Sequence, residues 1–219
     1  MYAMVGTRPD LCTAVGILSR YLQAPTNIHW EMALRVLQYL SGTINHGISF
    51  QSTGNISKDT SPLVWTDADY ANDMAAKSIS GYGIKLCNGP IIWYSKRQST
   101  TAQSTAEAEY ISANMCARTL VWLRQLLSCL GFPPTGPTTI YEDNQSCIAI
   151  AKNPQINEKT AHIQVKYHYI REKMDDDSIK LVYCKTDEQI ADMFTKGLSS
   201  PLFTKFCKLF GLSDLGGDL

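Results

Sequence analysis

The feature that most constrains the fold is a long helical pattern in the middle of the chain. It runs from Ser104 to Leu130 and is stopped by Gly131 and Pro133-Pro134. Steps of four and three residues from Glu109 meet an uninterrupted apolar stripe, whereas the same steps from Glu107 meet mostly polar residues. The pattern therefore predicts a helix that turns the Glu109 face to the core and leaves Glu107 facing solvent.

Short apolar runs on both sides of this helix indicate strands. Three precede it, and Asn88-Gly89 between the second and third favours a hairpin, because Asn and Gly tolerate positive φ. The expected strands are Pro62–Asp69, 79–86, 90–95, Thr138–Asp143 and Ile179–Cys184. Further helices are expected over Gln145–Lys152, 160–174 and Glu188–Lys196. This order predicts an α/β protein with a mixed five-stranded sheet flanked by helices.

The rest of the chain divides around this domain. Residues 1–50 contain helical patterns at 11–22 and 28–40, which are too short to make a domain alone. Residues 51–61 are polar and rich in turn formers, as in a linker. We therefore expect a short helical segment at 1–50, a linker at 51–61, the α/β domain at 62–200 and a C-terminal tail at 201–219.

Composition excludes several classes of protein. A hydrophobic fraction of 44% supports a packed core and excludes disorder as the main state. No apolar stretch reaches the ~18 residues of a membrane span, and the N-terminus does not have the pattern of a secretory signal. Seven scattered cysteines favour reduced thiols in an intracellular protein. The 20 basic and 20 acidic residues balance, which argues against a globally basic nucleic-acid binder.

Four acidic residues lie at the ends or beginnings of separate elements. They are Asp67, Glu109, Asp143 and Asp192. Taken singly, each is more simply explained as a helix cap or a solvated group. Taken together, carboxylates that converge from separate elements would repel one another unless they held a divalent metal, for which oxygen ligands are suited. The four acids are therefore candidate ligands of a metal centre.

An ordered series of motifs extends this interpretation along nearly the whole chain. It consists of Gly6-Thr7-Arg8-Pro9-Asp10, Leu18-Ser19-Arg20-Tyr21, His29-Trp30, Tyr39-Leu40-Ser41-Gly42-Thr43, Asp67-Ala68-Asp69-Tyr70-Ala71, Ser80-Gly81-Tyr82, Trp93-Tyr94-Ser95-Lys96-Arg97-Gln98, Ser104-Thr105-Ala106-Glu107-Ala108-Glu109-Tyr110, Trp122-Leu123-Arg124, Asp143-Asn144-Gln145, Lys152-Asn153-Pro154, His162-Ile163, Tyr167-His168-Tyr169-Ile170-Arg171-Glu172 and Ala191-Asp192-Met193-Phe194-Thr195-Lys196. In this series the chain resembles the ribonuclease H domain of Ty1/copia-type retrotransposon polyproteins.

The resemblance implies a ribonuclease H-like fold and hydrolysis of the RNA strand in RNA–DNA hybrids. It implies a two-metal mechanism with Mg²⁺, or Mn²⁺ in its place, held by Asp67, Glu109, Asp143 and Asp192. Residues 1–50 resemble the connection from the C-terminal end of a reverse transcriptase, which we expect upstream in a full polyprotein. The Tyr-Val-Asp-Asp polymerase motif does not occur in this sequence. Such a protein would be cytoplasmic, in a virus-like particle, or nuclear, and not secreted.

Further residues are candidates for contacts with the nucleic acid. The predicted set is Asn144, Gln145, Lys96, Arg97, His162 and Arg171. The family often has Lys and Asp around the motif histidine, whereas this chain has Ala161 and Gln164, so we expect its hybrid contacts there to differ from those of the family. Two alternatives stay open: a nuclease of the same fold with another substrate, and an inactive transposon-derived relic that only binds nucleic acid or a protein partner.

Overall fold

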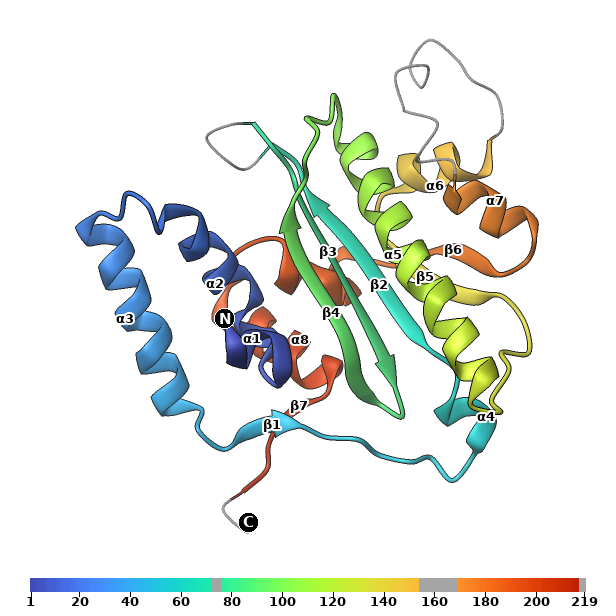
Figure 1. Cartoon of the computed structure of the whole chain (residues 1–219), viewed down its shortest axis with the longest axis horizontal. Helices are drawn as coiled ribbons and strands as arrows, with labels where there is room; N and C mark the ends of the chain where they lie inside the picture. Colours follow the sequence, from blue (N-terminus) through green and yellow to red (C-terminus); the bar gives the residue numbers. More distant parts are fainter. Residues whose placement is uncertain (72–75, 154–168, 217–219) are drawn as a thin grey trace.

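The structure is a computed structural model that describes residues 1–71, 76–153 and 169–216. Its centre is a five-stranded sheet in the order β4-β3-β2-β5-β6 (Figure 1). The strands are β2 (Leu63–Asp69), β3 (Ile79–Leu86), β4 (Gly89–Arg97), β5 (Thr138–Glu142) and β6 (Ile179–Tyr183). The β2-β3 and β3-β4 pairs are antiparallel, whereas β2-β5 and β5-β6 are parallel. The predicted mixed five-stranded sheet is confirmed.

The β3-β4 hairpin forms as expected but with its turn one residue earlier. Cys87 and Asn88 take positive φ values of 50° and 59°, and Gly89 begins β4. Gly89 is needed for another reason. A side chain there would collide with the ring of Phe50 and the carbonyl oxygen of Ser49, which pass directly over the strand.

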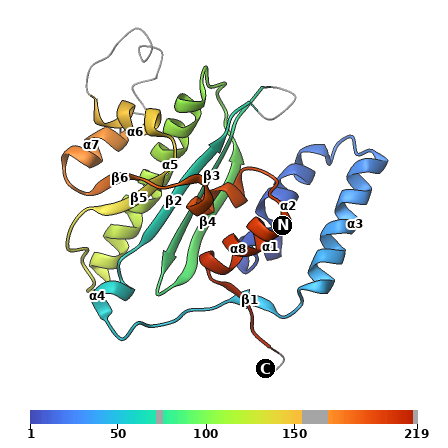
Figure 2. The ribbon, with the colours of Figure 1, turned by 180° about the vertical axis from the view of Figure 1, so that it is seen from behind.

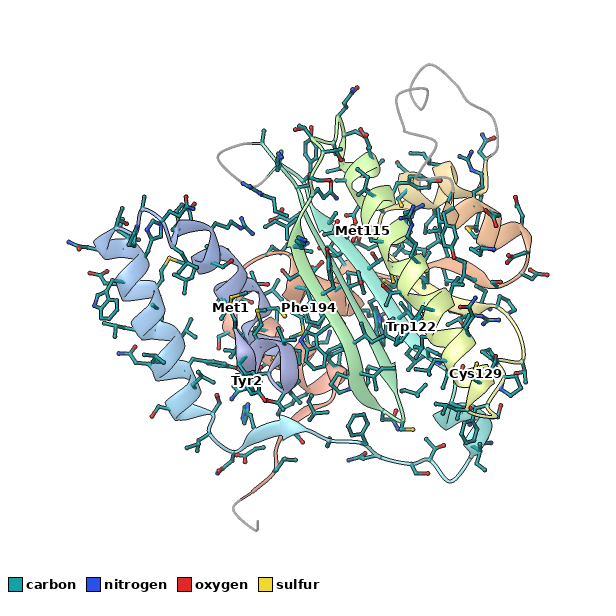
Figure 3. All side chains as sticks on the ribbon, in the orientation of Figure 1. Met1, Tyr2, Met115, Trp122, Cys129 and Phe194 are labelled. Carbon is teal, nitrogen blue, oxygen red and sulfur yellow. The ribbon has the colours of Figure 1, made fainter. Side chains whose placement is uncertain are left out.

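Helix α5 (Thr105–Cys129) covers one face of the sheet, and α6 (Gln145–Lys152) and α7 (Tyr169–Asp175) pack beside it. Its predicted apolar stripe is buried, from Ala113 to Leu127. Figure 3 labels Met115, Trp122 and Cys129 along this helix. The predicted helix at 160–174 is described only from Tyr169 onward, since residues 154–168 lie outside the described part of the chain.

The expectation that Glu107 faces solvent is wrong. Its side chain is buried, and Glu107 Oε2 accepts a hydrogen bond of 2.6 Å from the backbone N–H of Gln103. The backbone N–H of Glu107 in turn donates to Ser104 Oγ at 3.1 Å. A helical periodicity considers only the helix, whereas here the preceding loop folds back on the first turn and Glu107 serves as its acceptor.

The opposite face of the sheet is covered by the C-terminal part of the chain (Figure 2). Helix α8 (Ser200–Phe210) buries Phe206 and Phe210 against Phe194, which is labelled in Figure 3. Most of the region named a C-terminal tail is therefore part of the packed body. The predicted helix over Glu188–Lys196 is instead two 3₁₀ helices, η4 (Thr186–Glu188) and η5 (Ile190–Phe194). Each of these turns is too short to establish a helical period.

The N-terminal helices stand beside the edge strand β4. They are α1 (Tyr2–Gly6), η1 (Pro9–Leu11), α2 (Cys12–Leu18), η2 (Ser19–Tyr21) and α3 (Asn27–Gly42). Arg8 and Asp10 form a buried ion pair of 2.7 Å, and Tyr39 of α3 donates a hydrogen bond of 2.8 Å to Asp10. These contacts hold the N-terminal helices to one another. Other contacts hold the segment to the rest of the chain: Trp93 Nε1 of β4 donates to the carbonyl oxygen of Met4 at 2.7 Å, and β1 (His46–Ile48) pairs antiparallel with β7 (Leu212–Asp214).

The segment expected as a linker contains one short helix, α4 (Ile56–Asp59). Asn55 caps it, since Asn55 Oδ1 accepts from the backbone N–H of Lys58 at 3.2 Å. Across the described ranges, no helix combines the length and the apolar character that a membrane crossing requires.

Candidate metal centre

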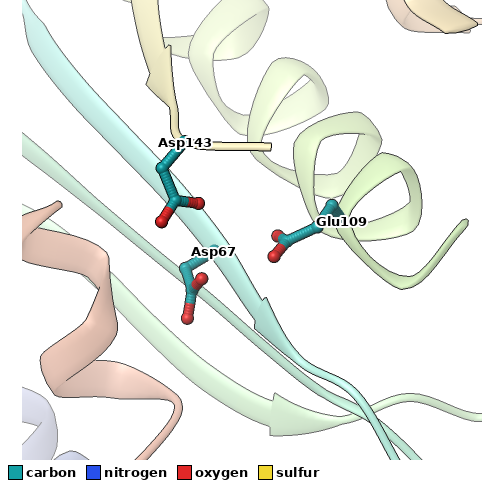
Figure 4. A group of neighbouring side chains, drawn as sticks. All are labelled: Asp67, Glu109 and Asp143. Atoms are coloured by element: carbon teal, nitrogen blue, oxygen red, sulfur yellow. The ribbon is translucent and has the colours of Figure 1, made fainter. Parts of the chain in front are cut away.

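Three carboxylates from three different elements meet at one end of the sheet (Figure 4). Asp67 lies near the end of β2, and Asp143 directly follows the parallel neighbour β5. Because Trp65 pairs with Tyr141, each aspartate stands two residues beyond the same rung of the sheet. Glu109 approaches from the first turns of α5, and one oxygen atom of each carboxylate lies within 4.8 Å of the others.

This group lines an open depression of about 410 Å³. Ala68, Asp69, Tyr70 and Thr105 contribute to its walls, as do Asn144 and Lys196. Asp67 and Glu109 are buried, whereas Asp143 is half-buried. The depression therefore gives a ligand in solution access to an otherwise buried acidic group.

Burial and mutual repulsion favour protonated carboxyls here. Burial raises the pKa of Asp67, against the lowering effects of Lys196 and Thr195. Burial, together with the charges of Glu142, Asp67 and Asp143, raises the pKa of Glu109 well above its ordinary value. Glu109 Oε2 is buried and has no hydrogen-bond partner among the described residues. A divalent cation fits this donor set, because it satisfies an unpartnered oxygen and removes the repulsion at once.

Asp192, the fourth predicted acid, is not a member of the three-carboxylate group. It lies on η5, where burial and the charge of Asp67 raise its pKa to about 7. Lys196 forms an ion pair of 3.0 Å with Asp192 Oδ1 and lies 4.0 Å from Asp67 Oδ2. The structure therefore brings Asp192 to the edge of the group, where a lysine links it to Asp67.

Sequence reasoning missed three residues of this site. Glu142 is fully buried beside the predicted acids, and burial raises its pKa well above the ordinary value. Thr195 Oγ1 donates a short hydrogen bond to Asp67 Oδ2, and Lys196 supplies the cation. A signal for Glu142 was present, because strand alternation that turns Ile140 inward also turns Glu142 inward. Thr195 and Lys196 follow η5, whose 3₁₀ turn gives no such periodicity.

Of the predicted nucleic-acid contacts that the structure describes, Asn144 alone lines the depression. It also caps α6, because Asn144 Oδ1 accepts from the backbone N–H of Cys147 at 2.9 Å. Gln145 is exposed at the first position of α6. Arg171 of α7 donates from Nη2 to the carbonyl oxygen of Ile150 at 2.8 Å. Lys96 and Arg97 are exposed at the end of β4, and His162 lies outside the described residues.

Comparison with known proteins finds relatives of the chain among curated proteins. No protein-family model matches it. Its homologues are nevertheless Ty1/copia-type retrotransposon Pol polyproteins, which resemble it over nearly its whole length. The chain thus resembles one part of these retrotransposon Pol polyproteins.

Two curated relatives illustrate this. The retrovirus-related Pol polyprotein from transposon TNT 1-94 of Nicotiana tabacum is 41% identical over 213 residues, which are 97% of this chain and 16% of that protein. The Pol polyprotein from transposon RE2 of Arabidopsis thaliana is 37% identical over 207 residues, 94% of this chain and 14% of that protein. The chain thus spans about a sixth of their length. Among solved structures, LC11-RNase H1 isolated from compost is 16% identical to this chain, with a TM-score of 0.47. The aligned region covers 62% of this chain and 93% of that one.

Proposed function

We propose that this chain hydrolyses the RNA strand of RNA–DNA hybrids, as the ribonuclease H part of a copia-type Pol polyprotein. One observation carries the proposal. Asp67, Glu109 and Asp143 converge from two strands and a helix to within 4.8 Å, in an open depression with an unpartnered buried oxygen. An acidic group of this kind is costly without a cation, so its presence supports metal-dependent chemistry. Homology to Pol polyproteins supports a nucleic-acid substrate.

The proposed ligands of the metal are Asp67, Glu109, Asp143 and Asp192. When bound, a pair of Mg²⁺ ions, or Mn²⁺ in their place, would activate water and stabilise the leaving oxygen of an in-line phosphodiester hydrolysis. The carboxylates need only hold fixed positions, which the rigid ends of β2, β5 and α5 support. Lys196 keeps the Asp67 and Asp192 charges compensated before a metal binds.

Substrate recognition in the proposal depends on the polar and basic residues expected from the sequence. Asn144 and Gln145 lie at the start of α6 beside Asp143 and are suited to hydrogen bonds with sugar hydroxyls. Lys96 and Arg97 are proposed to contact backbone phosphates, as are Arg171 and His162.

The same proposal assigns roles to the parts of the chain. Residues 1–50 are the connection from an upstream reverse transcriptase, 51–61 a linker, 62–200 the ribonuclease H-like domain and 201–219 its C-terminal extension. The site of action would be intracellular, in cytoplasmic virus-like particles or the nucleus.

The test is cleavage of a labelled RNA–DNA hybrid with Mg²⁺ and with EDTA. We expect Mg²⁺-dependent cleavage of the RNA strand by the natural sequence and at least a hundredfold loss in Asp143→Asn, a loss of about 3 kcal/mol of transition-state stabilisation. Asp187→Asn, an exposed aspartate on η4, is the matched control and should keep full activity.

Two results would contradict the proposal. Hybrid binding without cleavage by the natural sequence would favour the inactive relic. Equal cleavage of double-stranded DNA and of the hybrid would favour a nuclease of the same fold with another substrate.

A further inference from the structure

A second depression, of about 320 Å³, opens between the N-terminal helices and the end of β4. Arg20 of η2 forms one wall, and Lys77, Lys96 and Arg97 form the other. No acidic side chain is among the described residues that line it. In a chain with 20 basic and 20 acidic residues, such one-sided charge marks a binding surface for an anion. We call these four residues and the depression they line the basic groove.

The basic groove lies at the same end of the sheet as the acidic group. Asp69 pairs with Ile79 across β2-β3, and Ile79 pairs with Arg97 across β3-β4. Two strand spacings put Arg97 roughly 10 Å from Asp69. Asp69 lines the depression that holds the acidic group, so a strand with a phosphate there needs only one or two further nucleotides to reach the groove.

Buried contacts hold the groove in register with the acids. Gln98, which follows Arg97, donates from Nε2 to Ser80 Oγ and to the carbonyl oxygen of Ala108, both at 2.9 Å. Ala108 is the neighbour of Glu109 on α5. The end of β4 is therefore tied to the helix turn that carries a proposed metal ligand.

The N-terminal wall is equally well placed. Gly16 of α2 packs next to Ser95 of β4, since a Cβ on Gly16 would lie 3.8 Å from Ser95 Oγ. Ser19 Oγ is held by a hydrogen bond of 2.8 Å to the carbonyl oxygen of Gly16. Across the groove, Lys77 Nζ donates to the carbonyl oxygen of Ser99 at 3.0 Å. Arg20 and Lys77 thus face one groove from parts of the sequence about sixty residues apart.

We propose that the basic groove binds the sugar–phosphate backbone of the nucleic acid beside the cleavage site, and that residues 1–50 supply one wall of this binding site. The proposal rests on the proposed function for the identity of the polyanion. It changes the role of the N-terminal segment, which becomes part of the substrate-binding surface as well as a connection. Arg20 and Lys77 become contact residues, alongside the Lys96 and Arg97 expected from the sequence.

The test measures binding of a fluorescent RNA–DNA hybrid by anisotropy in EDTA, so that cleavage plays no part. The variants are Arg20→Gln, Lys77→Gln and their double variant. Each lost phosphate contact should lower the magnitude of the slope of log K against log salt by about 0.7 to 0.9, and affinity at 0.1 M salt by up to about tenfold. Lys180→Gln and Lys208→Gln, exposed lysines of β6 and α8, are matched controls that should change neither.

A wild-type affinity and salt slope in the double variant would overturn the proposal. If the variants do not fold, acetylation of the natural sequence replaces them. The hybrid should then protect Lys77 and Lys96 from the reagent and leave Lys180 and Lys208 reactive, and equal reactivity of all four would overturn the proposal. The two proposals fail separately. A folded chain that never cleaves the hybrid, but whose variants change the salt slope, would support the basic groove and contradict the nuclease function. Cleavage by the natural sequence together with an unchanged slope in the variants would support the nuclease function and contradict the basic groove.

Discussion

Lys196 Nζ lies 3.0 Å from Asp192 Oδ1, one helical turn earlier in the chain, at the edge of the acidic group. Burial lowers the pKa of Lys196, but the charges of Asp67 and Asp192 outweigh it and raise that pKa above its ordinary value. The ammonium therefore stays charged and compensates part of the negative charge. In the metal-free protein, Lys196 thus supplies positive charge that a bound divalent cation would also supply.

Lys196→Met should make the acidic group more dependent on metal. Without the ammonium, the buried carboxylates lose their counter-charge, and the metal-free protein should lose about 1 kcal/mol, a modest amount because the Lys196 side chain is 35% exposed. The Mg²⁺-induced rise in Tm should be larger in Lys196→Met than in the natural sequence. Thermal unfolding in EDTA and in Mg²⁺ measures both quantities, and an unchanged Mg²⁺ shift would rule out this role for Lys196.

The stability of the metal-free protein should fall as pH rises. Asp192 has an ordinary pKa of 3.8 and a folded value of about 7, and the pKa values of Asp67, Glu109 and Glu142 are raised as well. Between these limits the folded state binds more protons than the unfolded state. The free energy of unfolding of the metal-free protein is therefore highest, as far as these carboxyls are concerned, below about pH 4. It falls by a few kcal/mol in all as pH rises through 7.

Mg²⁺ should act in the opposite direction, because it binds the ionised carboxylates and its stabilisation grows with pH. Urea unfolding across this pH range, with and without Mg²⁺, checks both trends. Asp192→Asn should flatten the metal-free profile between pH 4 and 7. A metal-free stability that rises through this range would contradict the assignment.

Glu107→Ala should destabilise the fold without abolishing cleavage. The substitution leaves the backbone N–H of Gln103 without its acceptor, at a cost of about 1 to 2 kcal/mol, whereas the cap bond from the backbone N–H of Glu107 to Ser104 Oγ is kept. Glu107→Gln keeps an acceptor oxygen and should recover much of the loss. The measurements are the free energy of unfolding and the cleavage rate below Tm. A hundredfold loss of rate in folded Glu107→Gln would mean that Glu107 belongs to the catalytic group.

Phe210→Ala should show that α8 is part of the core. Phe210 is fully buried and stacks edge-on against Phe194, with ring centroids 5.2 Å apart. Its truncation should cost about 3 to 5 kcal/mol. Leu209→Ala, at the neighbouring exposed position, should cost less than about 0.5 kcal/mol. Equal small losses in the two variants, measured by urea unfolding, would show that the C-terminal helix is dispensable.

Local patterns in the sequence determined most of the sheet and its main helix. Alternating and apolar runs predict β2 to β6 to within two residues at each end, and the period of α5 selects Glu109 as the inward carboxylate. These features are local, because strand and helix periods follow from a few neighbouring residues. The same reasoning misjudged Glu107, whose burial depends on a loop that folds back over the helix end.

Only the tertiary structure decided which side chains meet. Pairing of β2 with β5 brings Asp67 and Asp143 together across about seventy-five residues of sequence. The spacing of apolar residues within each strand does not predict which strands pair or in which register. Glu142, Lys196 and Thr195 join the site because buried charged and polar groups need partners that are close in space. The sequence by itself supplied the elements and the types of chemistry that they carry. The long-range packing of α8, η5 and the N-terminal helices on the sheet decided the rest, since contacts between distant segments leave no periodicity to read.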